Sequence, residues 1–325
     1  MAQHTDGEPR HGSYLDVNTH KDMLQDVVRT SAYAEAIRAV VKPGQRVIDF
    51  GSGTGVLAIF AARVGAQVDA IERTAMVVHA REIARRSGCP GIRFHHADHD
   101  SFRSEGSVDV IVSEWMGHAV FYESMLEPLI DVRRRWLAPG GVMVPSRLDL
   151  ACALVTDEAL YEDGSFLERR PYGIDFGPIA GLPLRQSRLV SLDEHQVATP
   201  CCALGSLDMQ LIEQTPALLE GTLLPAADTS AFGLLVWFEA ELAPGVTLGT
   251  GPHHPPTHWR QVFLPFPQPL EVVAGRPITL SIAPPRDVEA QHATWAWAAS
   301  DGAQSIRVDE RESWVLSSGS GRAGL

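Results

Sequence analysis

Two glutamates, nine positions apart, bracket the most distinctive segment of the chain. The segment SEWMGHAVFYES (113–124) carries Glu114 and Glu123 directly after a short apolar run. Two carboxylates at this spacing suit a general acid–base pair, a metal site or a fork for a planar cation. A guanidinium fits the third, because its five donors match carboxylates bidentately. No His or Asp at ligand spacing supports a metal, so we predict none.

A glycine loop forms the second candidate site. The sequence VIDFGSGTG (47–55) ends an apolar run with three alternating glycines. Its G-x-G-x-G spacing differs from the dinucleotide fingerprint, which weighs against a nicotinamide oxidoreductase. Glu72 ends the next predicted strand, where a carboxylate binds both ribose hydroxyls of an adenosine, and Asp100 follows the third, near the adenine amine. Together they predict S-adenosylmethionine as the cofactor, with S-adenosylhomocysteine as its product.

The elements that hold these loops alternate between helix and strand. Strands in alternation with helices predict a parallel, doubly wound α/β sheet. We expect strands over 45–50, 67–72, 92–95 and 107–113, and helices over 20–41, 56–63 and 74–87.

The pattern changes after Trp136. The sequence LAPGG (137–141) predicts a turn, and period-two alternation then indicates an antiparallel β-domain. Pro/Gly clusters such as PHHPP (252–256) punctuate its strands, and 317–325 resembles a flexible tail. The expected strands begin over 147–155 and recur at 208–213, 233–241, 259–265, 276–282 and 305–315.

Composition narrows the class of protein. The chain has 325 residues and a net charge of −13, which argues against nucleic-acid binding. Residues 1–146 hold 16 Lys+Arg and 18 Asp+Glu, whereas residues 147–325 hold 11 and 22. No apolar run is long enough for a membrane span, and the N-terminus lacks the layout of a signal peptide. Four cysteines form no disulfide framework, so we expect a cytoplasmic protein.

Four motifs in order give the chain a recognisable pattern. MLQDVVRT (23–30), GSGTG (51–55), SEWMG-x-x-x-FYESM (113–125) and THW (257–259) together resemble the protein arginine methyltransferase family. The resemblance covers about residues 14–315. It implies a Rossmann-like class I methyltransferase domain followed by an antiparallel β-barrel with an inserted dimerisation arm, and a head-to-tail homodimer.

The resemblance also implies a domain layout. An N-terminal segment with a cofactor-covering helix takes 1–44, and the S-adenosylmethionine-binding domain takes 45–146. The β-barrel substrate domain takes 147–316, with its arm at 157–186, before the tail at 317–325.

The resemblance assigns roles residue by residue. Glu114 and Glu123 would grip the substrate guanidinium, and the proton would leave through Glu123 or through a pair formed by His258 and Asp26. Tyr14 matches a tyrosine of the family's substrate-entry segment, and we also expect substrate contacts from His118 and Trp259. The cofactor would be bound by His20, Met23, Arg29, Asp49, Gly51, Ser52, Gly53, Gly55, Glu72 and Asp100.

Departures from the family pattern bear on the substrate. Arg10 and His11 replace a Tyr-Phe pair, and His118 stands where the loop commonly has Tyr. Such groups suit the carboxylate of a free amino acid, and the scarcity of Lys beside 25 Arg suggests a bacterial source. The sequence therefore favours free L-arginine or a small guanidine in a biosynthetic pathway. Arginine in proteins is the alternative, and an inactive methyltransferase-like scaffold is the other class considered. The number of methyl groups added stays open.

Overall fold

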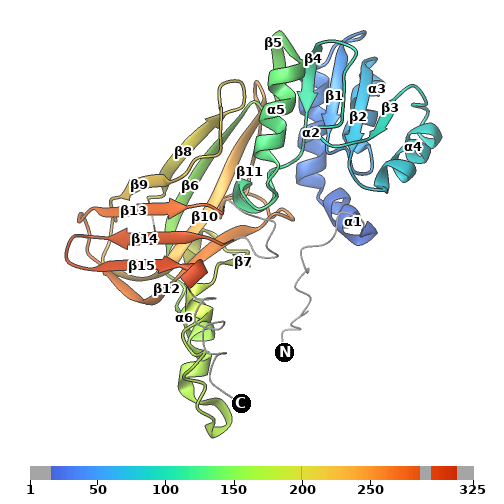
Figure 1. Cartoon of the computed structure of the whole chain (residues 1–325). Helices are drawn as coiled ribbons and strands as arrows, with labels where there is room; N and C mark the ends of the chain where they lie inside the picture. The colour runs from blue at the N-terminus through green and yellow to red at the C-terminus, as the bar shows by residue number, and fades with distance from the viewer. Residues whose placement is uncertain (1–15, 199, 286–293, 313–325) are drawn as a thin grey trace, which may run out of the picture. The chain divides into compact units, whose positions relative to one another are not determined.

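Two compact units make up the chain (Figure 1). The computed structural model describes residues 16–198, 200–285 and 294–312. The first unit takes the described residues up to 114, with 131–145 and 242–246, and the second takes most of the remainder. Among the described helices, none has both the length and the apolar character needed to cross a membrane.

The first unit contains a five-stranded parallel sheet with the order β3-β2-β1-β4-β5. Its central strands are apolar on both faces, as expected when helices cover a parallel sheet. Val47, Ile48 and Val110, for example, are fully buried. The strands are β1 (Arg46–Phe50), β2 (Gln67–Glu72), β3 (Arg93–His96), β4 (Val108–Val112) and β5 (Leu137–Val144).

Helices alternate with these strands, which confirms the predicted α/β fold class. They are α1 (Val17–Gln25), α2 (Val27–Val40), α3 (Val56–Val64), α4 (Met76–Arg86) and α5 (Leu126–Trp136). The prediction of a single helix over 20–41 is wrong, because the helix is interrupted at Asp26, between α1 and α2. Its ψ of 89° is not helical, and its side chain accepts a hydrogen bond from the Arg29 amide as the N-cap of α2.

The turn predicted for LAPGG is also wrong, because these residues lie in β5. Proline interrupts a central strand by removing an N–H donor, but an edge strand tolerates it. β5 is the edge strand beside β4, so Pro139 fits there.

The second unit consists of antiparallel strands in two sheets, which confirms the β-domain. One has the order β7-β12-β10-β6-β8, with β11 paired to β10, and the other has the order β15-β14-β13-β9. The strand predicted over 208–213 is wrong, because β8 ends at Asp208 and a turn follows. The strands are β6 (Arg147–Val155), β7 (Arg188–Val190), β8 (Cys202–Asp208), β9 (Leu219–Leu223), β10 (Thr229–Ala243), β11 (Val246–Gly249), β12 (Gln261–Val272), β13 (Ile278–Ala283), β14 (Ala296–Ser300) and β15 (Ser305–Asp309).

The segment 157–186 projects from the second unit, where α6 (Glu158–Gly164) leads into short 3₁₀ turns (Figure 1). Several of its apolar side chains face solvent instead of a core. Tyr172 is 93% exposed, and Phe166, Ile174 and Ile179 are each about half exposed.

Candidate active site

The glycine loop lies at the carboxyl end of β1, where ligands bind in open α/β sheets. Gly51, Gly53 and Gly55 all have positive φ angles, of 75°, 50° and 79°. At Gly53 space is limiting as well, because a Cβ atom there would lie 3.0 Å from a ring carbon of His20. The buried His20 side chain thus places α1 directly against the loop. This is the close backbone approach for which glycine is required.

Two polar atoms in this loop region are buried and unsatisfied. Asp49 Oδ2 accepts a hydrogen bond from the Ala58 amide at 2.9 Å. Asp49 Oδ1 and Ser52 Oγ have no hydrogen-bond partner among the described residues. Because buried polar groups are almost always paired, these atoms fit a polar ligand in the loop. Burial raises the pKa of Asp49 to about 7, although the Ala58 hydrogen bond lowers it.

Glu72 is held in place at the end of β2. Its two carboxylate oxygens accept hydrogen bonds from the Gly53 amide at 2.9 Å and the Thr74 amide at 2.7 Å. The buried carboxylate therefore lies beside the glycine loop, as a ribose ligand requires. Asp100 differs, because its side chain is 74% exposed and pairs with Arg135 at 3.4 Å. The ribose and adenine roles of these two acids stay predictions.

Arg29 and Glu114 form a buried ion pair, with side chains 6% and 8% exposed. Arg29 Nε and Nη2 both donate to Glu114 Oε2, at 3.0 and 2.8 Å. Nη1 donates to the Met23 carbonyl in α1 at 2.9 Å. Arg29 therefore joins α1 to the first glutamate of the pair. The expected pairing of Arg29 with the cofactor carboxylate stays a prediction.

The loop that carries Glu123 has a strained backbone. Gly117 has a φ of 44°, and a Cβ atom there would lie 2.7 Å from Glu123 Cγ. Sequence reasoning missed Gly117, although a glycine inside a chemically distinctive loop was the available signal. Positive φ at residues other than glycine is uncommon and clusters at functional sites. Three such residues occur here, namely Ala119, Val120 and Ser124.

The expected substrate contacts of the second unit are tightly packed. His118 Nδ1 lies 2.5 Å from the carbonyl oxygen of Trp259, and its ring packs edge-on against Tyr122. Trp259 is 1% exposed and contacts Phe238, with ring centroids 5.4 Å apart. The His258 ring lies beside that of Trp259, at 4.6 Å. Trp259 is therefore a core residue, and its part in shaping a substrate pocket stays a prediction.

Asp26 and His258 are the other two residues predicted to be catalytic. Asp26 Oδ1 accepts a hydrogen bond from the Arg29 amide at 2.9 Å, so it has a structural role at the start of α2. Asp26 belongs to the first unit and His258 to the second. Their pairing as a proton relay stays a prediction. Tyr14, like Arg10 and His11, lies outside the described residues.

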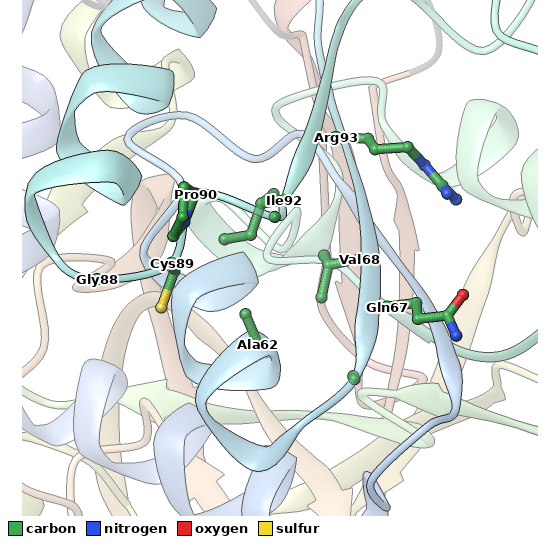
Figure 2. A pocket seen from close by; sticks show the side chains of 10 residues that line it. Ala62, Gln67, Val68, Gly88, Cys89, Pro90, Ile92 and Arg93 are labelled. Atoms are coloured by element: carbon green, nitrogen blue, oxygen red, sulfur yellow. The ribbon is translucent and has the colours of Figure 1, made fainter.

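Cavities of two sizes occur in the described part of the first unit. The larger, of about 630 Å³, lies between α1 and α4 and is lined by His20, Thr54 and Met76 among others. The smaller, of about 290 Å³, is lined by Gln67 and Arg93, the first residues of β2 and β3 (Figure 2). It therefore lies at the amino ends of these strands, away from the glycine loop.

A parallel sheet of this order, with a glycine loop after β1 and a carboxylate at the end of β2, is a Rossmann-like nucleoside-binding fold, and its G-x-G-x-G spacing is that expected of a class I methyltransferase. Two family models match this chain and agree with that class. The methyltransferase domain matches residues 47–141, and the arginine methyltransferase oligomerization subdomain matches residues 149–295.

Known proteins with similar sequences or folds point to one family. Protein arginine N-methyltransferase 6 of Xenopus laevis is 32% identical over 297 residues, which cover 86% of this chain and 87% of that protein. The PRMT1 enzyme–prozyme heterotetrameric complex of Trypanosoma brucei with AdoHcy has a chain that is 28% identical. It superposes with a TM-score of 0.84 and covers 92% of this chain and 98% of its own. Protein arginine methyltransferase 10 of Arabidopsis thaliana shares the fold, with 24% identity, a TM-score of 0.75 and coverage of 91% and 97%.

The chain belongs to the protein arginine N-methyltransferase family. It is an S-adenosylmethionine-dependent methyltransferase, which confirms the predicted enzyme class and cofactor. The glycine loop, Glu72 and the unsatisfied atoms of Asp49 and Ser52 are the residues that fit this cofactor.

Proposed function

We propose that this enzyme methylates a guanidino nitrogen of arginine, and that the arginine is part of a protein. One observation carries the guanidine assignment: the buried Glu114 carboxylate already binds a guanidinium in this structure, that of Arg29. Both hydrogen bonds from Arg29 go to Oε2 of Glu114, and we assign Oε1 to the substrate guanidinium. The protein assignment is supported by curated relatives that are named for action on protein arginine.

The chemistry requires residues that orient and polarise an unreactive nucleophile. Arginine nitrogen is a poor nucleophile because its lone pairs are delocalised and its pKa exceeds about 12. Unequal contacts to Glu114 and Glu123 concentrate the positive charge on one nitrogen and leave lone-pair density on the other. S-adenosylmethionine supplies an electrophilic sulfonium methyl group. Holding the nucleophile in line with that methyl contributes on the order of 7–11 kcal/mol to lowering the barrier.

Free L-arginine is the second candidate substrate, and the altered residues Arg10, His11 and His118 favour it. The structure weakens the argument from His118. Its Nδ1 is committed to the Trp259 carbonyl and its ring packs against Tyr122, so it is poorly available to a substrate carboxylate. For this reason we favour arginine in a protein over the free amino acid.

We further propose a homodimer formed through the projecting segment 157–186. Apolar side chains such as Tyr172 are exposed there, and apolar area on a projecting element marks a contact surface. The oligomerization subdomain match over 149–295 includes this segment. A cytoplasmic location, expected from the sequence, stays a prediction.

The test of the substrate uses S-adenosylmethionine labelled in its methyl group. The full chain is incubated in parallel with a glycine/arginine-rich peptide and with free L-arginine. Label in the peptide supports the proposal, whereas label in free arginine alone overturns it in favour of the second candidate. The same peptide with lysine in place of arginine is the control for the guanidine assignment.

Two variants separate the substrate from the cofactor roles. Glu123→Gln should lower turnover at least ~100-fold and leave S-adenosylhomocysteine binding unchanged, because it removes charge at the guanidinium. Glu72→Ala should instead weaken S-adenosylhomocysteine binding, measured by calorimetry. Equal loss of cofactor affinity in both variants would show that Glu123 is wrongly assigned.

A further inference from the structure

A cluster of two histidines and a glutamate lies in the second unit and includes none of the predicted site residues. His253 and His254 belong to the PHHPP segment, and Glu239 lies on β10. One potential ligand atom from each residue lies within 4.8 Å of the other two. His253 Nε2 and Glu239 Oε1 are 3.3 Å apart. Two ligands of one tetrahedral zinc ion, bound at about 2.0–2.1 Å, lie at about this separation.

The backbone of the loop is shaped to hold both imidazoles on one side. The His254 amide donates to the Gly251 carbonyl at 2.9 Å, which closes a turn with Pro252 at its second position. The ring centroids of the two histidines lie 4.1 Å apart. A Cβ atom at Gly249 would overlap the His254 ring. The imidazole therefore lies directly on the Gly249 backbone, and only glycine leaves it that space.

The hydrogen-bonding capacity of His254 is not used within the described part of the chain. Its Nδ1 is buried and has no partner there. A buried polar atom left unpaired costs about 1–3 kcal/mol, so its retention needs a reason. Binding of an ion through this nitrogen would be such a reason.

We infer that Glu239, His253 and His254 bind a divalent transition-metal ion of the zinc type. Imidazole and carboxylate together suit zinc and its neighbours, whereas magnesium and calcium prefer oxygen ligands alone. Two of the three residues are about half exposed, so an ion reaches the site from solvent, and water completes its coordination. This proposal departs from the absence of a metal that the sequence predicts.

The ion would tie the loop at 250–257 to β10. His258 and Trp259 follow that loop directly, so the metal would position the segment that leads into them. This is a positioning role, and it is independent of which guanidine the enzyme methylates.

A second group of potential ligands, His99, Asp100 and Asp131, carries no such proposal. The Arg135 guanidinium pairs with both aspartates and already supplies the positive charge that a metal would bring. It serves instead as an internal comparison for the experiment.

The test measures binding of Zn²⁺ to the full chain by calorimetry and of Co²⁺ by its visible absorption. We expect one ion per chain. The variants Glu239→Gln, His253→Gln and His254→Gln should each weaken binding at least ~100-fold, since loss of an outer-sphere partner alone costs 10–100-fold. His96→Gln, an exposed histidine of the other unit, is the matched control and should bind as the wild type does.

Two results would overturn the inference. One is the absence of stoichiometric Zn²⁺ binding to the wild type. The other is binding that persists in all three variants and is lost in His99→Gln. Circular dichroism of each variant separates loss of the ligand from loss of the fold, and Glu239→Gln, on an exposed strand position, is the variant least able to disturb folding.

Discussion

The buried carboxylate of Asp49 makes the stability of this protein depend on pH in an unusual direction. Burial raises its pKa from 3.8 to about 7. The native state therefore retains a proton that the unfolded chain has lost, and stability falls as pH rises from about 4 to about 7. At about 1.4 kcal/mol for each pKa unit, the full effect is about 4 kcal/mol. Above pH 7 the carboxylate is ionised in both states and the penalty stays constant.

The substitution Asp49→Asn removes this titration and keeps an acceptor for the Ala58 amide. We expect the free energy of unfolding of the variant, relative to the wild type, to rise by about 2.5 kcal/mol between pH 5 and pH 8. Urea unfolding at unit steps of pH, without cofactor, measures it. Asp149→Asn, half-exposed on β6, is the control and should show no comparable trend. A difference for Asp49→Asn that is flat with pH, or of opposite sign, would refute the reasoning.

Three further predictions follow from the site and the projecting segment. Arg29→Met should lower the free energy of unfolding by about 3–5 kcal/mol, because it leaves Glu114 buried without its partner, and adding Glu114→Gln should recover part of that loss in urea unfolding. Gly117→Ala should reduce kcat at least ~10-fold and also lower Tm, because the new methyl group displaces Glu123 and an L side chain is strained at this φ; normal turnover would contradict the close approach of Glu123 to Gly117. Tyr172→Asp should convert a dimer into the 35.3 kDa monomer in light scattering, and a variant that stays dimeric would place the interface elsewhere.

Local patterns predicted the first unit well because each of its signals lies within a few residues. The glycine loop follows β1 directly, and Glu72 ends the next strand, so strand order alone brings them to one edge of the sheet. The helix over 20–41 failed because its apolar periodicity continues through Asp26, whereas the N-cap hydrogen bond of that residue breaks it.

Contacts between distant residues were not predictable from such patterns. Arg29 and Glu114 are 85 positions apart, and only the folded sheet brings them together. The same holds for Glu239, which is 14 positions from His253 and faces it only through the return of the chain after β11. PHHPP was correctly identified as an interruption between strands, but its partner on β10 has no signature in the sequence.

The buried Arg29 guanidinium is bonded both to α1 and to Glu114, so it links that helix to the first glutamate of the pair. One attachment is the Met23 carbonyl of α1, the helix whose His20 packs on the glycine loop, and the other is Glu114. A ligand that stabilises the packing of α1 on that loop would also restrict Arg29, and with it the orientation of the Glu114 carboxylate. Coupling free energy is reciprocal, so the ligand of one site must raise the affinity of the other by the same factor. With the proposed roles of the glycine loop and Glu114, heterotropic cooperativity between the methyl donor and the guanidine would depend on this single side chain.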